Sequence, residues 1–296
     1  MSKIMTKAIV VSLLFIAGDA EAAPLGLDED MGNILVLEQG FSLLRDRHRY
    51  PLWTPFEWQK DACIIGADSS GLALVETFFR LTAEITGNRV SSLPVMQANS
   101  CPVASDLFVL FSATPDEVLN RILMIDTVAD TNFSKSVTVE ENQFDFAAID
   151  FFNEKALVSV IWNTGDSEEW RNATLIQELF HVYTAGNDVN WQGKFSSMLH
   201  EVDPDPTGVR FVPDSAAWKS AKLAQNAVGL CSSDIFVLAA LSSYTKHAKK
   251  NFALPSLSSR DLLNYAWENR VTLMEPIELA ANGWNAYELV LDRRCW

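Results

Sequence analysis

The sequence predicts an α+β fold, with strands and helices mixed in the first two-thirds of the chain and helices alone in the last third. Two observations support this prediction. Apolar β-rich runs alternate with amphipathic runs as far as residue 184, and the later runs have helical periodicity only. Hydrophobic residues make up 48% of the 296 residues and aromatic residues 10%, which suffices for a substantial buried core.

Residues 1–22 are typical of a secretory signal peptide. Lys3 and Lys7 give a basic start, residues 8–17 are apolar, and Ala20-Glu21-Ala22 is a small-residue cleavage site. The apolar run is too short to span a bilayer, which takes about 20 residues. No cysteine lies near the cleavage site to carry a lipid. We therefore expect an exported protein, periplasmic or secreted, without a stable membrane anchor.

The elements of the first half follow from their end signals. Residues 53–58 and 63–65 are β-rich, and Ser69 or Ser70 offers an N-cap for an amphipathic helix that ends at Gly87. A glycine just beyond a helix adopts the left-handed conformation that closes the last turn. This segment is therefore predicted as a long helix.

The next elements are further strands around a second helix. Residues 106–112 are β-rich, and Thr114 with Pro115 gives a cap and a first-turn proline. Residues 144–152 and 156–162 read as strands, and the second is nearly all apolar, as expected of a buried strand. Four helices are predicted after the loop that follows residue 200: 215–228, 234–249, 258–270 and 277–291.

Between these parts lies the sequence Gln177-Glu178-Leu179-Phe180-His181. It is a zinc-protease motif, H-E-x-x-H, with glutamine at the first histidine position. In the intact motif both histidines bind zinc from one helical face, and the glutamate activates water. A neutral amide is a poor zinc ligand, so the motif favours a scaffold without catalytic metal.

Helical spacing separates this segment into two faces. An apolar arc holds Leu175, Ile176, Leu179, Phe180, Val182 and Tyr183, and a polar stripe holds Thr174, Gln177, Glu178, His181 and Thr184. The stripe is either the hydrated side of the helix or the lining of a cleft. A long helix, several strands and a final apolar strand precede it, which is the chain order of a zincin. We therefore expect a zincin-like mixed sheet with long helices at residues 23–200, and a helical part at 201–296 packed on the same core.

Several short stretches resemble a family of bacterial exported proteins that carries a domain-of-unknown-function label. They are Leu81–Gly87, Ala98-Asn99, Leu175–Asp188, Phe195–Leu199 and Ser233-Asp234. The resemblance implies a zincin-like fold without a full metal set. The family usually has an acid at the position of Gln177 and a glutamine at that of His181, so His181 moves this chain back toward metal binding.

A third ligand would have to come from elsewhere in the chain. His200 follows the motif by about twenty residues and could complete a site with His181, with Glu178 as the general base. In the alternative, the acidic stretch 203–214 mimics a calcium loop, although Pro204 and Pro206 stiffen it and favour an ordinary turn. We expect no cofactor in the scaffold hypothesis and zinc in the peptidase hypothesis.

Four cysteines lie beyond the cleavage site, and an even number in an exported protein indicates disulfides. Three connectivities are compatible with the sequence. We favour Cys63–Cys101 and Cys231–Cys295, because each pair would link one half of the chain.

The net charge of −15 disfavours nucleic acid and anionic membranes as partners. Two functions fit the sequence. The first is a non-catalytic zincin-like scaffold that binds a peptide or protein partner along the old substrate cleft. The alternative is a metal-dependent peptidase that uses Glu178, His181 and His200.

Overall fold

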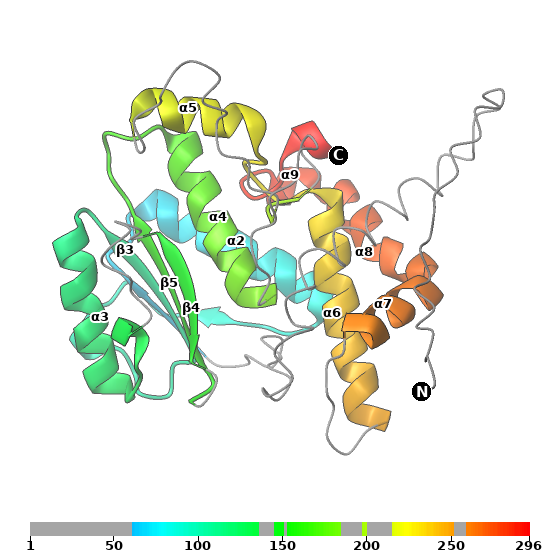
Figure 1. Ribbon diagram of the computed structural model, residues 1–296, viewed down its shortest axis with the longest axis horizontal. Helices are drawn as coiled ribbons and strands as arrows, with labels where there is room; N and C mark the ends of the chain where they lie inside the picture. The colour runs from blue at the N-terminus through cyan, green and yellow to red at the C-terminus, as the bar shows by residue number, and fades with distance from the viewer. Residues whose placement is uncertain (1–60, 136–144, 151–152, 185–196, 200–214, 252–258) are drawn as a thin grey trace, which may run out of the picture.

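The computed structural model describes residues 61–135, 145–150, 153–184, 197–199, 215–251 and 259–296 (Figure 1). The predicted signal peptide, the strand at 53–58, His200 and the acidic stretch 203–214 lie outside the described residues.

A five-stranded mixed sheet in the order β2-β1-β3-β5-β4 lies at the centre of the fold. β1, β2, β3 and β5 are parallel, and the edge strand β4 is antiparallel to β5. The strands are β1 (Asp61–Ile65), β2 (Ser91–Ser92), β3 (Leu107–Ser112), β4 (Phe146–Asp150) and β5 (Lys155–Ile161).

Helices cover both faces of the sheet (Figure 1). Helices α2 (Ser69–Thr86) and α4 (Glu168–Thr184) lie on one face, and α3 (Pro115–Ala129) lies on the other. Strand residues alternate between the two faces. In β1, Ile64 packs in the core beneath α2 and α4, and Cys63 packs in the core beneath α3.

The C-terminal third is helical and packs on the larger of these two cores. α6 lies against α2, and α8 lies against α6, so that Phe236 and Ile277 share a core with α2 and α4. The helices are α5 (Ala216–Gln225), α6 (Ser232–Asn251), α7 (Ser259–Glu268), α8 (Arg270–Asn282) and α9 (Trp284–Tyr287). The prediction of an α+β fold with a helical C-terminal part is confirmed.

The two predicted disulfides are present. Cys63 is bonded to Cys101, and Cys231 to Cys295, with Cα–Cα separations of 5.8 and 5.3 Å. Cys63, Cys101 and Cys231 are buried. Two disulfides fit the oxidising compartment in which an exported protein folds.

Some predicted ends were wrong. The N-cap of α2 is Asp68 rather than a serine, because its carboxylate accepts the Gly71 N–H at 2.8 Å. The last predicted helix, at 277–291, is replaced by α8, which begins seven residues earlier at Arg270, and by the short α9 after Gly283.

Asp68 also ties α2 to the end of β5. Its second carboxylate oxygen accepts a hydrogen bond from the Trp162 indole at 3.0 Å. The Arg171 guanidinium of α4 lies over the Trp162 ring, 4.9 Å from the ring centroid. The N-termini of α2 and α4 are thus joined at the carboxyl ends of the parallel strands.

Candidate functional site

Helix α4 carries the degenerate motif and lies against β5 and the edge strand β4. Every residue of its predicted apolar arc is buried, from Leu175 to Tyr183. The Tyr183 ring meets Phe78 of α2 edge-on, with centroids 5.3 Å apart. The motif is therefore held on a rigid helix between the sheet and the C-terminal layer.

The polar stripe of α4 is only partly exposed. Gln177, Glu178 and His181 are half-buried, each with interactions of its own. Thr184 does not belong to the stripe as predicted, because it is buried and its hydroxyl donates to the Phe180 carbonyl at 2.7 Å. Glu178 and His181 share one side of the helix, as the sequence predicts.

The structure does not test the predicted third ligand. His200 falls outside the described residues, so no distance joins it to His181. Within the described segments, no three His, Cys, Asp or Glu side chains form a group that could hold a metal ion. The involvement of Glu178, His181 and His200 in a metal site stays a prediction.

The hydrogen bonds of β5 fix which way the backbone of β4 points. The N–H groups of Ala156 and Trp162 donate to the carbonyls of Asp106 and Ser112 on the β3 side. The N–H of Ile161 donates instead to the Asp145 carboxylate, beside β4. Because successive backbone groups alternate in direction, even-numbered residues of β5 face β3 and odd-numbered ones face β4.

The same alternation turns part of the β4 backbone outward, away from β5. Phe146 and Ala148 lie opposite the odd-numbered Ser159 and Leu157, so their backbone groups point inward to β5. Ala147 and Ile149 therefore direct their N–H and C=O groups outward. Among the residues that the structure describes, none forms a hydrogen bond with these outward groups or extends the sheet beyond β4.

The side chains of β4 are less covered than those of the inner strands. Ala148 is buried, and the other four residues are half-buried, whereas every residue of β3 is buried. Ala147 and Ile149 pack against the core on the α2 and α4 side. A strand added beside β4 would therefore lie next to α4 and gain apolar contact as well as backbone hydrogen bonds.

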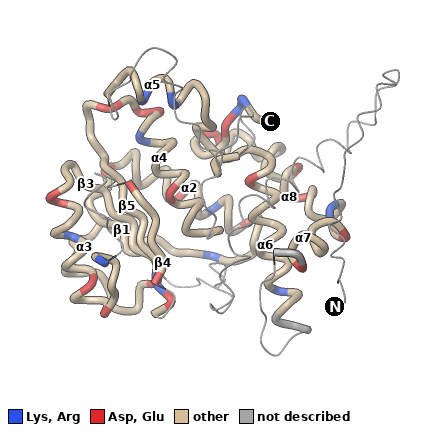
Figure 2. The backbone as a smooth tube through the Cα atoms, viewed as in Figure 1, with Lys and Arg blue, Asp and Glu red and all other residues tan. Residues whose placement is uncertain are grey.

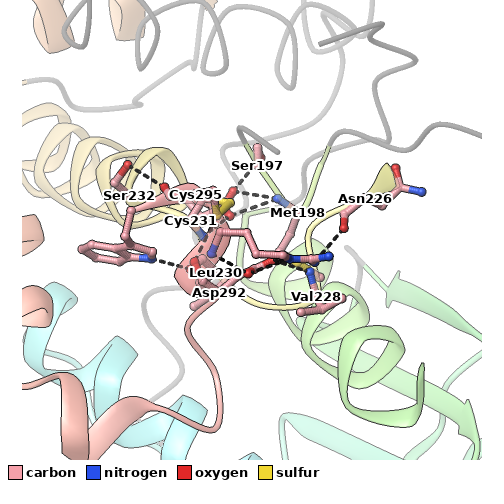
Figure 3. Close-up of a disulfide and its surroundings, with 12 residues drawn as sticks. Ser197, Met198, Asn226, Val228, Leu230, Cys231, Ser232, Asp292 and Cys295 are labelled. Carbon is pink, nitrogen blue, oxygen red and sulfur yellow. Dashed lines mark hydrogen bonds and ion pairs between the residues drawn. A yellow bond between two sulfur atoms is a disulfide. The ribbon is translucent and has the colours of Figure 1, made fainter. Parts of the chain in front are cut away.

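A buried carboxylate holds the segment after α4 against the C-terminal layer (Figure 3). Asp234, in the first turn of α6, accepts hydrogen bonds from the Ser197 hydroxyl at 2.5 Å and from the Met198 N–H at 3.0 Å. It also accepts the N–H of Cys231 at 2.8 Å. Burial raises the pKa of Asp234 to about 7, and the negative charge of Asp292 adds to that rise while the three donors oppose it.

Asp292 forms the second half of this arrangement. Its carboxylate accepts the Val228 N–H at 2.8 Å and pairs with the Arg294 guanidinium at 2.7 Å. Arg294 also donates to the carbonyls of Leu223 and Asn226, both at 2.9 Å. These contacts hold residues 292–294 against the end of α5 and the loop after it, and the Cys231–Cys295 disulfide holds the next residue to the start of α6 (Figure 3).

The sequence alone did not predict this arrangement. Phe195–Leu199 and Ser233-Asp234 were noted only because they resemble stretches of a known family, and the structure brings Ser197 and Asp234 into contact. The local signal was an acid three residues after Cys231, which is half of a capping box. The long-range half of the contact spans 37 residues and has no local signal.

Comparison of the chain with protein-family models, with curated proteins and with solved structures gives no match. In the part of the chain that the structure describes, no helix is both long and apolar enough to cross a bilayer.

Proposed function

We propose that this exported protein is a non-catalytic, zincin-like scaffold that binds an extended segment of a protein partner as a sixth strand beside β4. The observation that carries the proposal is the outer edge of β4, where the N–H and C=O groups of Ala147 and Ile149 point away from the sheet. An extended peptide that pairs with such an edge gains main-chain hydrogen bonds without needing a metal.

The order of the elements supports the zincin-like part of the proposal. A long helix, then parallel strands, an antiparallel edge strand and a buried strand precede the motif helix α4. Gln177 supports the non-catalytic part, because an amide at the first ligand position weakens zinc binding.

Backbone direction makes the proposal testable at single residues. The probe is a set of peptides selected on the purified protein from a random phage-displayed library and then synthesised. In the free protein, the outward amides of Ala147 and Ile149 should exchange with solvent faster than the inward amides of Phe146 and Ala148. A peptide bound along β4 should slow exchange at Ala147 and Ile149, measured by NMR, and leave Phe146 and Ala148 unchanged. Selected peptides that protect other amides and not these would overturn the proposal.

A proline variant supplies a second readout. Ile149→Pro removes one outward N–H from an edge strand, where proline is tolerated because that N–H makes no ladder bond. We expect the affinity of the selected peptides to fall about tenfold, because the peptide loses the main-chain hydrogen bond that the N–H of residue 149 would donate. Ile149→Val, which keeps the N–H and a β-branched apolar side chain, is the matched control and should bind like the wild type.

The alternative is a metal-dependent peptidase, favoured by the placement of Glu178 and His181 on one side of α4. The protein purified without chelator should then contain stoichiometric zinc by elemental analysis. It should cleave an unfolded casein substrate, and Glu178→Gln or a chelator should abolish that cleavage. These results would replace the scaffold proposal.

A further inference from the structure

The stretch of sequence that contains β4 and α4 is rich in acidic residues. Residues 126–184 hold eleven acidic and three basic residues, a net −8 out of −15 for the whole chain. This stretch contains β4, its hairpin with β5, and α4. About half of the net charge thus lies in one-fifth of the sequence, and that fifth includes the edge strand β4.

The C-terminal layer has the opposite balance. Residues 215–296 hold nine basic and seven acidic residues, a net +2. Charges of both signs lie along these helices, as Figure 2 shows. The helices of the C-terminal layer therefore do not share the acidity of residues 126–184.

Acidic residues lie at both ends of β4. Asp145 directly precedes the strand, and its carboxylate accepts the Ile161 N–H of β5. Asp150 is the last residue of the strand, and its carboxylate accepts the Asn153 N–H in the turn. Glu154, in the turn to β5, is exposed. The one basic residue of this hairpin, Lys155, is buried, and its ammonium donates to the carbonyls of Val103 and Ser105 at 2.6 and 2.9 Å. Lys155 is thus committed to the loop before β3 and does not offset the acidity at the outer edge.

From this charge distribution we infer that the partner segment is basic: an extended stretch with Lys or Arg near both ends of its paired region. The inference rests on the proposed function. Five residues of β4 span about 17 Å at 3.4 Å per residue, which sets the spacing of the two basic positions. Electrostatic complementarity of this kind acts mainly through faster association and the exclusion of acidic segments.

The test starts from the same library peptides. Peptides that protect the amides of Ala147 and Ile149 should be enriched in Lys and Arg at their ends. Replacing those end residues by Glu should weaken binding about tenfold or more, since several rim charges change from attractive to repulsive. Raising the salt from 50 to 500 mM should reduce the difference between the two peptides because exposed charges are screened.

Protein variants provide the matched comparison. The double variant Glu154→Gln and Glu178→Gln removes one acid from the turn after β4 and one from α4. It should weaken binding of the Lys-ended peptide and leave the affinity of a Ser-ended twin unchanged. The control variant, Glu275→Gln with Glu278→Gln, removes two exposed acids from α8 and should change the affinity of neither peptide.

Failure of this inference is distinct from failure of the proposed function. Peptides that protect Ala147 and Ile149 but bind equally well with Lys, Ser or Glu at their ends would overturn the basic-partner inference alone. Peptides that leave both amides unprotected would overturn the strand-addition proposal itself.

Discussion

The Ser197 hydroxyl donates to the buried carboxylate of Asp234 across 2.5 Å, and this contact joins the segment after α4 to the first turn of α6. Both residues are fully buried, so neither group can exchange its partner for water. The helix that carries Glu178 and His181 is therefore followed by a fixed point in the C-terminal layer. That layer helps to hold the segment beyond the candidate site in place.

Ser197→Ala should destabilise the protein by about 1.5–3 kcal/mol, because it removes a hydrogen bond to a buried carboxylate. The free energy of unfolding in urea would measure the loss. Ser70→Ala is a matched control, since Ser70 also donates to an aspartate, Asp68, at 2.8 Å but is exposed. That control should cost less than about 0.5 kcal/mol. Equal losses in the two variants would contradict a special role for the buried contact.

Stability should fall between about pH 4 and pH 7 on account of Asp234. Burial raises its folded-state pKa from the ordinary value of 3.8 to about 7, so the folded protein binds this proton more tightly than the unfolded chain does. The resulting stabilisation is complete below pH 3.8, declines as the pH rises toward 7, and is absent above it.

Asp292 acts in a separate pH window. Burial acts to raise its pKa, but hydrogen bonds from Arg294 and Val228 outweigh burial and hold the pKa below 3.8. Its contribution is therefore present above pH 3.8 and is lost in stronger acid.

The prediction for Asp234 is tested by urea unfolding of the wild type and of Asp234→Asn at pH 4.5, 6 and 8. The free energy of unfolding should fall with pH between pH 4 and 7, and it should fall less steeply in the variant. An unchanged slope would contradict the assignment to Asp234, and Asp116→Asn, an exposed acid on α3, serves as the control.

The parts of the fold that depend on local signals were predictable. Gly87 closes α2 in the left-handed conformation, and Thr114 caps α3, because each effect needs only the neighbouring residues. The last helix was predicted to begin at residue 277, but α8 runs through Pro276, although proline usually ends helices. The burial of Leu273 and Ile277 on one face of α8 stabilises the helix enough to tolerate this proline.

The candidate site was predictable only in part. The placement of Glu178 and His181 on one side of α4 follows from helical spacing. The outward direction of Ala147 and Ile149 depends on the register of β4 against β5, which no residue of β4 specifies alone. β2, with two residues, has no sequence pattern at all and exists only through its pairing with β1.

A disulfide stabilises a protein mainly by restricting the unfolded chain, and the effect grows with the logarithm of the length of the closed loop. The loops closed here span 38 and 64 residues, so removing either disulfide should lower the free energy of unfolding by a similar amount, about 4 kcal/mol. Double Cys→Ala variants of each pair, unfolded in urea, would measure this. Loss of Cys231–Cys295 should also speed amide exchange at Val228 and Arg294, because it releases the chain end beside Asp292. Loss of Cys63–Cys101 should leave those amides unchanged, and a uniform effect of both variants on them would contradict this local role.

Asp68→Ala should destabilise the protein by about 2–4 kcal/mol, because two different donors lose their acceptor. The Gly71 N–H loses its N-cap, which costs about 1 kcal/mol. The Trp162 indole N–H, on a side chain that is 8% exposed, is left without its carboxylate, which costs a further 1–3 kcal/mol. Asp68→Asn keeps an acceptor for Gly71 and should cost less than half as much.

Trp162→Phe should remove the benefit of the indole contact alone. If the two losses were independent, the effects of Asp68→Ala and Trp162→Phe on the free energy of unfolding would add. We expect the double variant to lose less than their sum, because both substitutions break the same hydrogen bond.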